Sequence, residues 1–511
     1  MSENRILILD YGSQYTQLIA RRIRELNVFS EISNYDTPTE KIKKKNPSAI
    51  ILSGGPMSVY NKGAYKIDKK IFELNIPILG ICYGMQLIMN EFGSIITKSK
   101  VREYGKMIIK ITNRSTLFEG INKKISVWMS HGDKISSPDG NWEVLASSEN
   151  NIIAAVKLKK HNFYGVQFHP EVIQTEQGLD ILKNFIFEIA KCKASWTSKN
   201  FTLNALKSIK DKVGDNKIVC GISGGVDSTV MAVLINEALG NQSHFIFVNH
   251  GLLRKNEESD VINSLKNNLG MQIKIIDAST IFFKGLKGVT DPEQKRKVIG
   301  KLFIDTFEKE SKKIGKVKFL AQGTLYPDII ESGGSHSAVT IKSHHNVGGL
   351  PKNLKFKLVE PLKSLFKDEV REVGKNLKIP DFLIDRHPFP GPGLAVRIIG
   401  EVNENRVKIL QEADEIFIKI LRDKNRYNEI WQAFCVLIPI KTVGVMGDGR
   451  TYENLVALRA VTSVDGMTAD WYKMPNEILE EVSSEIINNV RGVNRVVYDV
   501  TSKPPGTIEW E

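Results

Sequence analysis

Three residues in the first third of the chain have the types and spacing that nucleophilic hydrolysis by a thiol requires. Cys82 follows the apolar run 76–81 and precedes apolar residues at helical spacing, which predicts a turn from a strand into a helix. A helix N-terminus favours the thiolate, the nucleophilic form of cysteine. His169 and Glu171 lie two positions apart at an expected strand end, so both side chains share one face and the carboxylate can orient the imidazole. The alternatives are an inert core cysteine and a structural His–Glu pair.

A second set of residues predicts a phosphate site. Residues Lys217–Ile222 are expected to form a buried strand and 227–239 a helix that ends at Gly240. Between them the chain reads Ser-Gly-Gly-Val-Asp-Ser, where the glycines let the backbone approach a ligand and the helix N-terminus presents free N–H groups. The lysine of a Walker loop is missing, and an ordinary tight turn is the alternative. The residues assigned to this phosphate site are Ser223, Gly224, Gly225, Val226, Asp227, Ser228 and Thr229.

Two acidic side chains are weaker candidates for Mg²⁺, which binds proteins through few carboxylates and otherwise through substrate phosphates. Asp227 lies in the phosphate loop, and Asp328 follows the expected strand 318–322. His344 and His345 have no carboxylate or cysteine at ligand spacing, so no zinc is expected, and no motif predicts haem or flavin. The cofactor expected is therefore Mg²⁺ bound together with the phosphates of a substrate. The polar stretch 326–351 is expected to be a long functional loop.

Alternating strands and helices predict an α/β fold that places these residues at sheet edges. Two doubly wound, mostly parallel sheets are expected, followed by a small C-terminal α+β domain that mediates dimerisation. The polar stretch 193–199 and the turn cluster 387–393 suggest the boundaries. The predicted domains are 1–192, 193–386 and 387–511. Expected strands include Arg5–Asp10, Ala49–Leu52, 76–81, 244–249, 272–276, 434–440 and 495–500, and expected helices include 15–26 and 405–421.

Composition excludes several classes of protein. The 511 residues are 41% hydrophobic, and no run approaches the roughly 20 uncharged apolar residues of a membrane span. The N-terminus has no signal-peptide pattern, and four scattered cysteines fit a reducing compartment, so a cytoplasmic location is expected. The net charge of +13 comes from lysines spread along the whole chain without interleaved aromatics, which favours small anionic substrates over nucleic acid.

The N-terminal motifs resemble those of the class I glutamine amidotransferases. The resemblance rests on Ser-Gly-Gly-Pro at 53–56, the segment around Cys82, and His-Pro-Glu at 169–171, and it extends from Arg5 to about Ala190. It implies that Cys82 attacks the glutamine amide, His169 moves protons and Glu171 fixes the imidazole. It also implies an oxyanion hole from the N–H groups of Gly55 and Tyr83. Further glutamine-pocket residues implied by the resemblance are Gly54, Gln86, Ser130 and His131.

The phosphate loop resembles the signature of the N-type ATP pyrophosphatases, which release pyrophosphate and leave AMP on the substrate. This resemblance implies that the residues assigned to the phosphate site, from Ser223 to Thr229, bind ATP together with Mg²⁺. The C-terminal segments 387–401, 431–452 and 503–511 are similar to the C-terminal domain of the glutamine-hydrolysing GMP synthase family. Together with the two sets of motifs upstream, this resemblance covers almost the whole chain. It implies a homodimer and a site for XMP. The residues it assigns to XMP are Arg296, Gln432, Asp448, Lys503, Thr507, Ile508 and Glu509. Salt bridges within or between domains are the alternative role for these residues.

The resemblance implies conversion of ATP, XMP, glutamine and water into AMP, pyrophosphate, GMP and glutamate. One rival is a related enzyme that modifies a tRNA base, which the basic charge favours slightly. The other is a non-catalytic nucleotide-binding protein with a decayed glutaminase. A decayed site would normally lack Cys82, His169 or Glu171, and all three are present.

Overall fold

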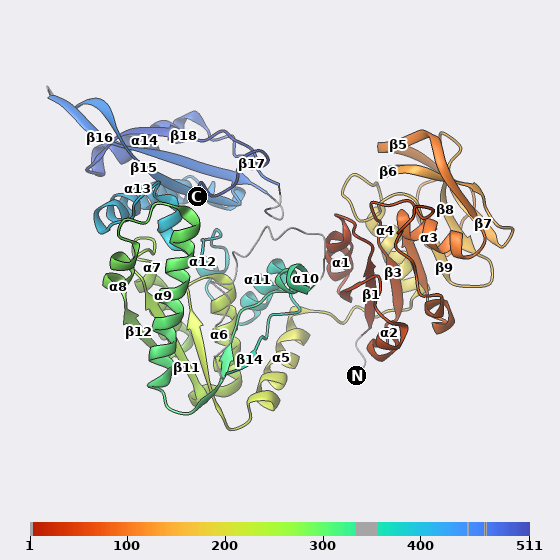
Figure 1. Ribbon diagram of the computed structural model, residues 1–511, viewed down its shortest axis with the longest axis horizontal. Helices are drawn as coiled ribbons and strands as arrows, with labels where there is room; N and C mark the ends of the chain where they lie inside the picture. The colour runs from red at the N-terminus through yellow and green to blue at the C-terminus, as the bar shows by residue number, and fades with distance from the viewer. Residues whose placement is uncertain (1–3, 334–355, 447–448, 464–465, 467) are drawn as a thin grey trace. The chain divides into compact units, whose positions relative to one another are not determined.

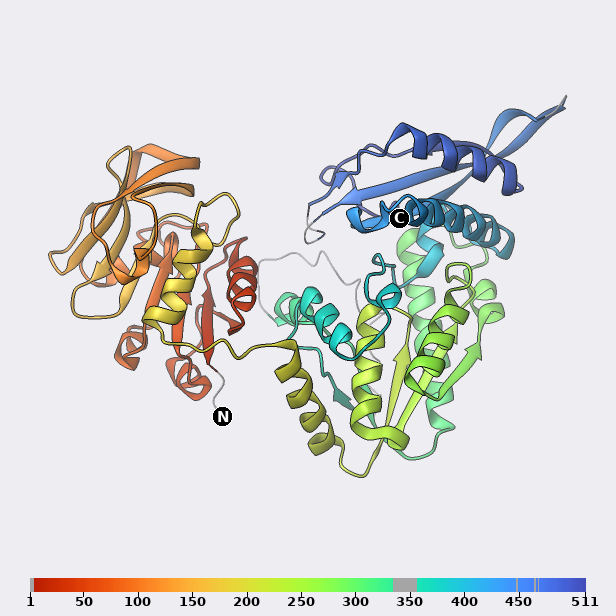
Figure 2. The same ribbon diagram turned by 180° about the vertical axis from the view of Figure 1, so that it is seen from behind.

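The computed structural model describes residues 4–333, 356–446, 449–463, 466 and 468–511 (Figures 1 and 2). Its contacts divide the chain into two compact units, one formed mainly by Met1–Phe201 and the other mainly by Thr202–Ile329 and the residues after 334. In the described part of the chain, no helix has the length and apolar character needed to cross a membrane. The predicted boundary at 386/387 falls inside the second unit.

The first unit is built on a 9-stranded sheet in the order β2-β1-β3-β4-β9-β8-β7-β5-β6. Strands β2, β1, β3, β4 and β9 run parallel, and the rest of the sheet is antiparallel. The strands are β1 (Arg5–Asp10), β2 (Phe29–Asn34), β3 (Ala49–Leu52), β4 (Ile78–Ile81), β5 (Ile95–Ile111), β6 (Lys124–Ser137), β7 (Trp142–Ser148), β8 (Ile153–Leu158) and β9 (Phe163–Val166). The helical segments are α1 (Thr16–Glu25), α2 (Thr39–Lys45), η1 (Lys69–Leu74), α3 (Tyr83–Glu91), η2 (Thr116–Phe118), α4 (Gly178–Lys183) and η3 (Asn184–Ile189).

This sheet contains more antiparallel pairing than the expected mostly parallel arrangement. Strands β3 and β4 are buried along their whole length, as parallel strands covered on both faces must be. In contrast, β6 alternates between buried and partly exposed positions, the pattern of an antiparallel strand with one solvated face. The parallel part, with its strand ends at the turns after β3 and β4, is the part that carries Gly54 and Cys82.

The second unit contains a five-stranded parallel sheet in the order β12-β11-β10-β13-β14. Its strands are β10 (Lys217–Ile222), β11 (Ser243–Asn249), β12 (Ile273–Asp277), β13 (Val317–Ala321) and β14 (Lys357–Val359). Because β11 lies on one side of β10 and β13 on the other, the strand order reverses at β10. Ligands of open α/β sheets bind at such a reversal, outside the carboxyl ends of the strands. The phosphate loop follows β10 directly.

Helices cover both faces of this sheet, as the doubly wound prediction requires. Figure 1 shows α9 in front of the strands and α6 behind them, and the turned view of Figure 2 shows the reverse. The helices are α5 (Ser198–Val213), α6 (Val226–Leu239), η4 (Gly240–Gln242), α7 (Glu257–Leu269), α8 (Ser279–Leu286), α9 (Pro292–Lys312), α10 (Tyr326–Gly333), α11 (Lys367–Asn376) and α12 (Asp381–Ile384). The expectation of a loop over 326–351 is wrong for its first part, which forms helix α10 with Asp328 accepting a backbone N–H at its first turn. Residues 334–351 lie outside the described residues.

The C-terminal segment forms a second, four-stranded sheet backed by two helices. The order is β15-β16-β17, and β18 pairs with β16. The elements are η5 (Gly393–Arg397), α13 (Glu404–Asp423), η6 (Tyr427–Glu429), β15 (Gln432–Met446), β16 (Gly449–Thr462), β17 (Asp470–Trp471), α14 (Asn476–Asn489) and β18 (Val493–Tyr498). One buried cluster runs from Val219 and Ile246 through Leu394 to Leu410 and Leu437. This shared core joins the C-terminal sheet to the nucleotide sheet within the second unit.

Candidate active sites

Cys82 lies on a strained turn between β4 and α3. Its φ is 51°, a left-handed conformation that is unfavourable for a residue with a side chain. The turn is possible because two glycines let the backbone segments approach one another. A Cβ on Gly80 would lie 2.5 Å from the Gly84 carbonyl carbon, and one on Gly84 would lie 2.4 Å from the Leu52 carbonyl oxygen. The predicted elbow is therefore present, with Cys82 as the N-cap of α3.

His169 and Glu171 form a buried pair beside Cys82. The His169 Nδ1 and Glu171 Oε1 atoms are 2.7 Å apart, and both side chains are almost fully enclosed. Burial by itself lowers the pKa of His169, but the Glu171 carboxylate and the hydrogen bond with Cys82 outweigh it and raise this pKa well above its usual value. The edge of the His169 ring packs against Tyr15, with ring centroids 4.9 Å apart. The three predicted catalytic residues thus meet in one site.

A glutamine that sequence reasoning missed links Cys82 to Gln86. The Gln167 amide nitrogen donates to Cys82 Sγ at 3.5 Å, and its oxygen accepts from Gln86 at 3.0 Å. Gln86 is buried, so it positions Gln167 and does not face solvent. The expectation that His169 and Glu171 lie at a strand end is wrong, because β9 ends at Val166 and residues 167–171 form an irregular turn. This turn, and not strand periodicity, brings Gln167, His169 and Glu171 together.

The predicted oxyanion-hole donors lie at the two sheet-edge turns. Tyr83 is the first residue of α3, so its N–H has no partner within the helix. Gly55 packs on this residue, because a Cβ on it would lie 3.3 Å from the Tyr83 ring and 2.7 Å from the Tyr11 carbonyl oxygen. A Cβ on Gly54 would lie 3.2 Å from His169 Cε1. The two glycines therefore leave room for His169 and Tyr83, which a side chain at either position would crowd.

Ser130 and His131 have different roles in the structure. The Ser130 carbonyl oxygen lies 3.7 Å from Cys82 Sγ, which places it at the site. The buried His131 has both ring nitrogens occupied, one by Glu103 at 3.0 Å and the other by the Asp133 carbonyl at 2.8 Å. Burial raises the pKa of Glu103, but its hydrogen bonds with His131, Ser148 and Asn150 leave that pKa below its usual value. His131 therefore supports the strand that carries Ser130.

The phosphate loop has the conformation of an anion cradle. Gly224 has φ +79°, and α6 begins two residues later at Val226. The Ser223 and Ser228 hydroxyl oxygens are 3.0 Å apart, and Ser228 also donates to the Gly225 carbonyl at 3.0 Å. N–H groups and hydroxyls therefore converge at the N-terminus of α6, as a phosphate site requires.

Asp227 lies at the crevice between β10 and β13. Its Oδ2 is 3.6 Å from Lys367 Nζ, whereas its buried Oδ1 has no hydrogen-bond partner among the described residues. Gly323, just after β13, lies against it, because a Cβ there would be 3.6 Å from the Asp227 carbonyl carbon. The buried Thr229 hydroxyl is also without a described partner. Asp328 is engaged elsewhere, since its Oδ2 accepts the Leu325 N–H at 2.9 Å.

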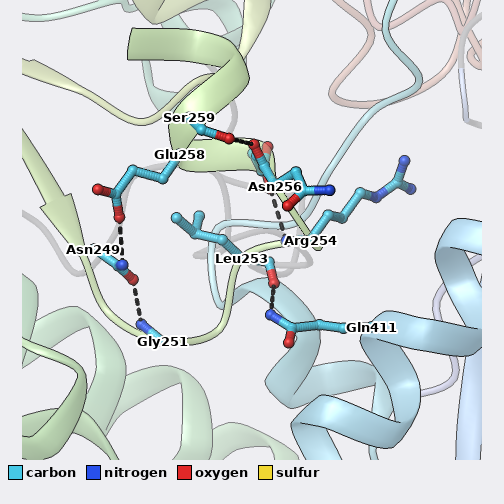
Figure 3. A pocket seen from close by; sticks show the side chains of 9 residues that line it. Asn249, Gly251, Leu253, Arg254, Asn256, Glu258, Ser259 and Gln411 are labelled. Carbon is cyan, nitrogen blue, oxygen red and sulfur yellow. Dashed lines mark hydrogen bonds between the residues drawn. The ribbon is translucent and has the colours of Figure 1, made fainter. Parts of the chain in front are cut away.

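A cavity of about 300 Å³ is lined mainly by residues 249–259, which follow the carboxyl end of β11 (Figure 3). Asn249 spans its mouth by accepting the Gly251 N–H at 2.8 Å and donating to Glu258. On the other side, Gln411 of α13 donates to the Leu253 carbonyl at 2.7 Å. Its lining side chains are mostly polar, which suits a polar ligand, and they follow β11, one strand away from the reversal at β10.

The carboxylate of Glu509 is contacted by Gln432, which was predicted to bind XMP, and by Arg397. Buried Arg397 binds it with two hydrogen bonds of 2.8 and 3.0 Å, and Gln432 donates to it at 2.6 Å. Arg397 NH1 is buried with no described partner, and its guanidinium lies 4.0 Å from the Phe434 ring centroid. Arg397 was not predicted, because only its position in space connects it with Glu509.

Other predicted residues hold the C-terminal tail in place. Arg296 donates to the Glu511 backbone oxygen at 2.6 Å, beside the buried Lys295 that pairs with the Glu511 side chain. The Lys503 ammonium donates to the Gly466 carbonyl at 2.8 Å, and Ile508 is buried. Thr507 and Glu509 line a cavity of about 480 Å³. Asp448 lies outside the described residues.

A cysteine–histidine–glutamate site on one α/β unit and a lysine-free phosphate cradle on another define a glutamine amidotransferase joined to an ATP-cleaving domain. The chain matches the families Glutamine amidotransferase class-I over residues 7–189, NAD synthase over 200–298 and GMP synthase C terminal domain over 419–510.

Full-length relatives place the chain in one family. Those named GMP synthase (glutamine-hydrolyzing) include proteins of Carboxydothermus hydrogenoformans, with 54% identity over 99% of this chain and 100% of the relative, and of Brachyspira hyodysenteriae, with 55% identity over 99% of both. The protein of Aquifex aeolicus is 53% identical over 100% of both chains. The chain belongs to the glutamine-hydrolysing GMP synthase family.

Proposed function

We propose that this enzyme makes GMP from XMP in two linked reactions, using glutamine as the nitrogen donor and ATP as the activating substrate. The observation that carries the proposal is the presence of both sites, with their side chains in place, in one chain that aligns end to end with its relatives. The tRNA-modifying alternative is not favoured by these relatives. Glutamine amide nitrogen is released in the first unit and is used in the second.

In the first unit, we assign Cys82 as the nucleophile that attacks the glutamine amide carbon. The tetrahedral oxyanion is stabilised by the N–H groups of Gly55 and Tyr83, and such donors are typically worth about 3–4 kcal/mol each. His169 gives a proton to the leaving ammonia and then activates the water that hydrolyses the thioester. Glu171 holds the imidazole and stabilises its charged form, and Gln167 fixes the sulfur by its 3.5 Å contact.

In the second unit, the XMP 2-oxygen attacks the α-phosphorus of ATP, and the bond to pyrophosphate breaks. The departing pyrophosphate is held by the loop from Ser223 to Ser228 and the N-terminus of α6. Ammonia then adds to C2 of the purine, and AMP leaves with the former 2-oxygen. Without this activation the oxygen would be a poor leaving group.

Asp227 Oδ1 is buried and has no hydrogen-bond partner in the described part of the chain, which fits a metal ligand, so we assign Mg²⁺ with ATP to this residue. Bound Mg²⁺ would neutralise charge on the phosphates. Lys367, 3.6 Å from the other Asp227 oxygen, supplies a further positive charge. Asp328 is the weaker candidate because its carboxylate already caps α10. For XMP we propose a site around Glu509, with Gln432 and Thr507 beside it. Arg296 of α9 contributes through its contact with Glu511.

The two-step scheme can be tested with the Cys82→Ala variant. Glutamine-dependent GMP formation is expected to fall to background, while millimolar ammonium salts restore it because the adenylating site is untouched. Thermal unfolding would check the fold of the variant. If ammonium failed to restore GMP formation in a folded variant, the division of labour would be wrong.

We also propose that the protein acts as a homodimer through its C-terminal sheet, in the cytoplasm where ATP and glutamine are present and thiols stay reduced. The hairpin of β15 and β16 extends past α13 in Figures 1 and 2. It exposes Val443, Val445 and Tyr452 by 53%, 74% and 56%, and Val443 lies opposite Tyr452. Such apolar side chains on a sheet favour a partner surface. Sedimentation should give a dimer, and Val445→Glu should weaken it; a monomeric wild type would contradict the proposal.

A further inference from the structure

Arg386 connects the phosphate loop to a helix start in the same unit. One of its guanidinium nitrogens donates to the Gly224 carbonyl oxygen at 2.8 Å. Another forms an ion pair with Glu257, at the first position of α7. Both side chains are largely buried, so this pair is shielded from salt and solvent. Arg386 lies 162 positions from Gly224 in the sequence and was not among the predicted site residues.

The bond to the Gly224 carbonyl determines where the next N–H points. Because the peptide unit is planar and trans, the Gly225 N–H is directed opposite to the Gly224 carbonyl. This N–H points toward the Ser223 hydroxyl, 3.4 Å away, which in turn meets the Ser228 hydroxyl. Gly224 can take this conformation, with φ +79°, because it has no side chain. The Gly225 N–H is thus engaged by Ser223, and by fixing this peptide Arg386 holds the loop in the shape that brings the two serine hydroxyls together.

The position of Arg386 is itself fixed by the C-terminal part of the chain. The ring of the next residue, His387, stacks on Tyr427 with centroids 3.7 Å apart and an interplanar angle of 7°. Its Nδ1 accepts the Ala433 N–H at 3.1 Å, at the start of β15. Two neighbouring residues thus contact the phosphate loop and the C-terminal sheet.

Glu257 belongs to a second connection between the same parts. It accepts the Arg254 N–H at 2.9 Å, and the Arg254 guanidinium lies 3.3 Å from Asp414 on α13. The other Asp414 oxygen accepts the Cys435 N–H of β15 at 2.9 Å. A chain of charged groups therefore leads from the loop carbonyl through Arg386, Glu257 and Arg254 to the C-terminal sheet.

We propose that Arg386 is a positioning residue for the pyrophosphate of ATP: it orients the Gly224–Gly225 peptide and ties the loop to the C-terminal sheet. The inference rests on the ATP-cleaving function proposed above. It assigns no contact between Arg386 and substrate. Because lysine cannot reproduce the planar fork that reaches both Gly224 and Glu257, the role requires arginine.

The test compares full-length Arg386→Gln and Arg386→Lys with the wild type and with Arg426→Gln. Arg426 is the control, since its 2.7 Å ion pair with Glu429 is exposed on both side chains. XMP-dependent pyrophosphate release from Mg-ATP gives KM for ATP and for XMP. Loss of a charge-assisted hydrogen bond should raise KM for ATP about tenfold or more in Arg386→Gln, with a smaller rise in Arg386→Lys. KM for XMP should change much less.

Glu257→Gln provides a second route if Arg386→Gln does not fold, because it keeps the shape and removes only the charge that holds Arg386. It should raise KM for ATP to a lesser degree in a protein with normal thermal unfolding. The proposal is overturned if KM for ATP in the folded variants matches Arg426→Gln, or if both KM values rise together, as a general structural defect would cause. If the wild type releases no pyrophosphate with XMP, the proposed function itself fails.

Discussion

Replacing Glu171 by glutamine would isolate the part that its charge plays in the glutaminase site. Glu171 is completely buried, and one carboxylate oxygen lies 2.7 Å from His169 Nδ1. The other oxygen has no partner among the residues that the structure describes. Glutamine has nearly the same size and keeps an acceptor oxygen, so the substitution removes charge with little change in packing.

The expected loss follows from the type of hydrogen bond. Hydrogen bonds to charged groups contribute about 1.5–3 kcal/mol and neutral ones about 0.5–1.5 kcal/mol. A difference of about 1–2 kcal/mol in stabilising the imidazolium corresponds to a rate about 5- to 30-fold lower. Burial lowers the pKa of His169, and the Glu171 carboxylate with Cys82 reverses this effect. Without the carboxylate, the effect of burial dominates and the pKa of His169 falls. The histidine then loses its proton at lower pH, so the alkaline limb of the pH–rate profile should move to lower pH.

Glutamate release at saturating XMP and ATP, measured from about pH 6 to 10, would show both effects. Glu188→Gln is a matched control, because that side chain is exposed and only 3.6 Å from Lys191 in a surface pair. GMP formation from ammonium salts would confirm that the second unit still works. A profile for Glu171→Gln that coincided with the control in rate and in its alkaline limb would refute the role assigned to the carboxylate.

Two further predictions concern stability. Gly84→Ala should abolish glutaminase activity and lower the melting temperature of the first unit, because the new Cβ would lie 2.4 Å from the Leu52 carbonyl oxygen. The control Gly140→Ala should change neither, because a Cβ there meets nothing within 4 Å. An active Gly84→Ala variant would contradict the close packing of the turn at Cys82. Burial lowers the pKa of His250 and of His387 to about 4. Since the unfolded chain binds these protons near its usual pKa of about 6.5, the free energy of unfolding should decrease as pH falls from 6.5 to 4, by up to about 3 kcal/mol per histidine. Urea titrations of the wild type and His387→Asn would measure this, and equal pH slopes would exclude His387 as a contributor.

The local parts of both sites could be predicted from the sequence. Cys82 and the phosphate loop each follow a short apolar strand and precede a helix, so their position at a sheet edge depends on neighbouring residues alone. The pairing of His169 with Glu171 was also predicted, although from a strand that in fact ends at Val166. These features need only the order of residues over a few positions.

Contacts between distant segments could not be predicted in this way. Arg386 and Gly224 are 162 positions apart, and Lys295 and Glu511 are 216 positions apart. No periodicity connects such residues, because their meeting depends on how the sheets and helices pack. The antiparallel half of the first sheet was missed for a similar reason, since the long pairing of β5 with β6 requires a β-bulge between Lys98 and Glu103.

Buried cationic side chains around the C-terminal tail fix the position of the tail more than they stabilise the folded protein. Lys295, Arg397 and Arg459 are fully buried and contact Glu511, Glu509 and the carbonyls of Thr501 and Thr507. Buried ion pairs contribute little net stability, because desolvation offsets most of their attraction. They do fix side-chain positions. Here they present a partly exposed Glu509 carboxylate beside an Arg397 nitrogen that has no hydrogen-bond partner among the residues described. Salt bridges and nucleotide binding were given as alternative roles for these residues. The two roles are compatible, because the salt bridges would hold a nucleotide site in shape.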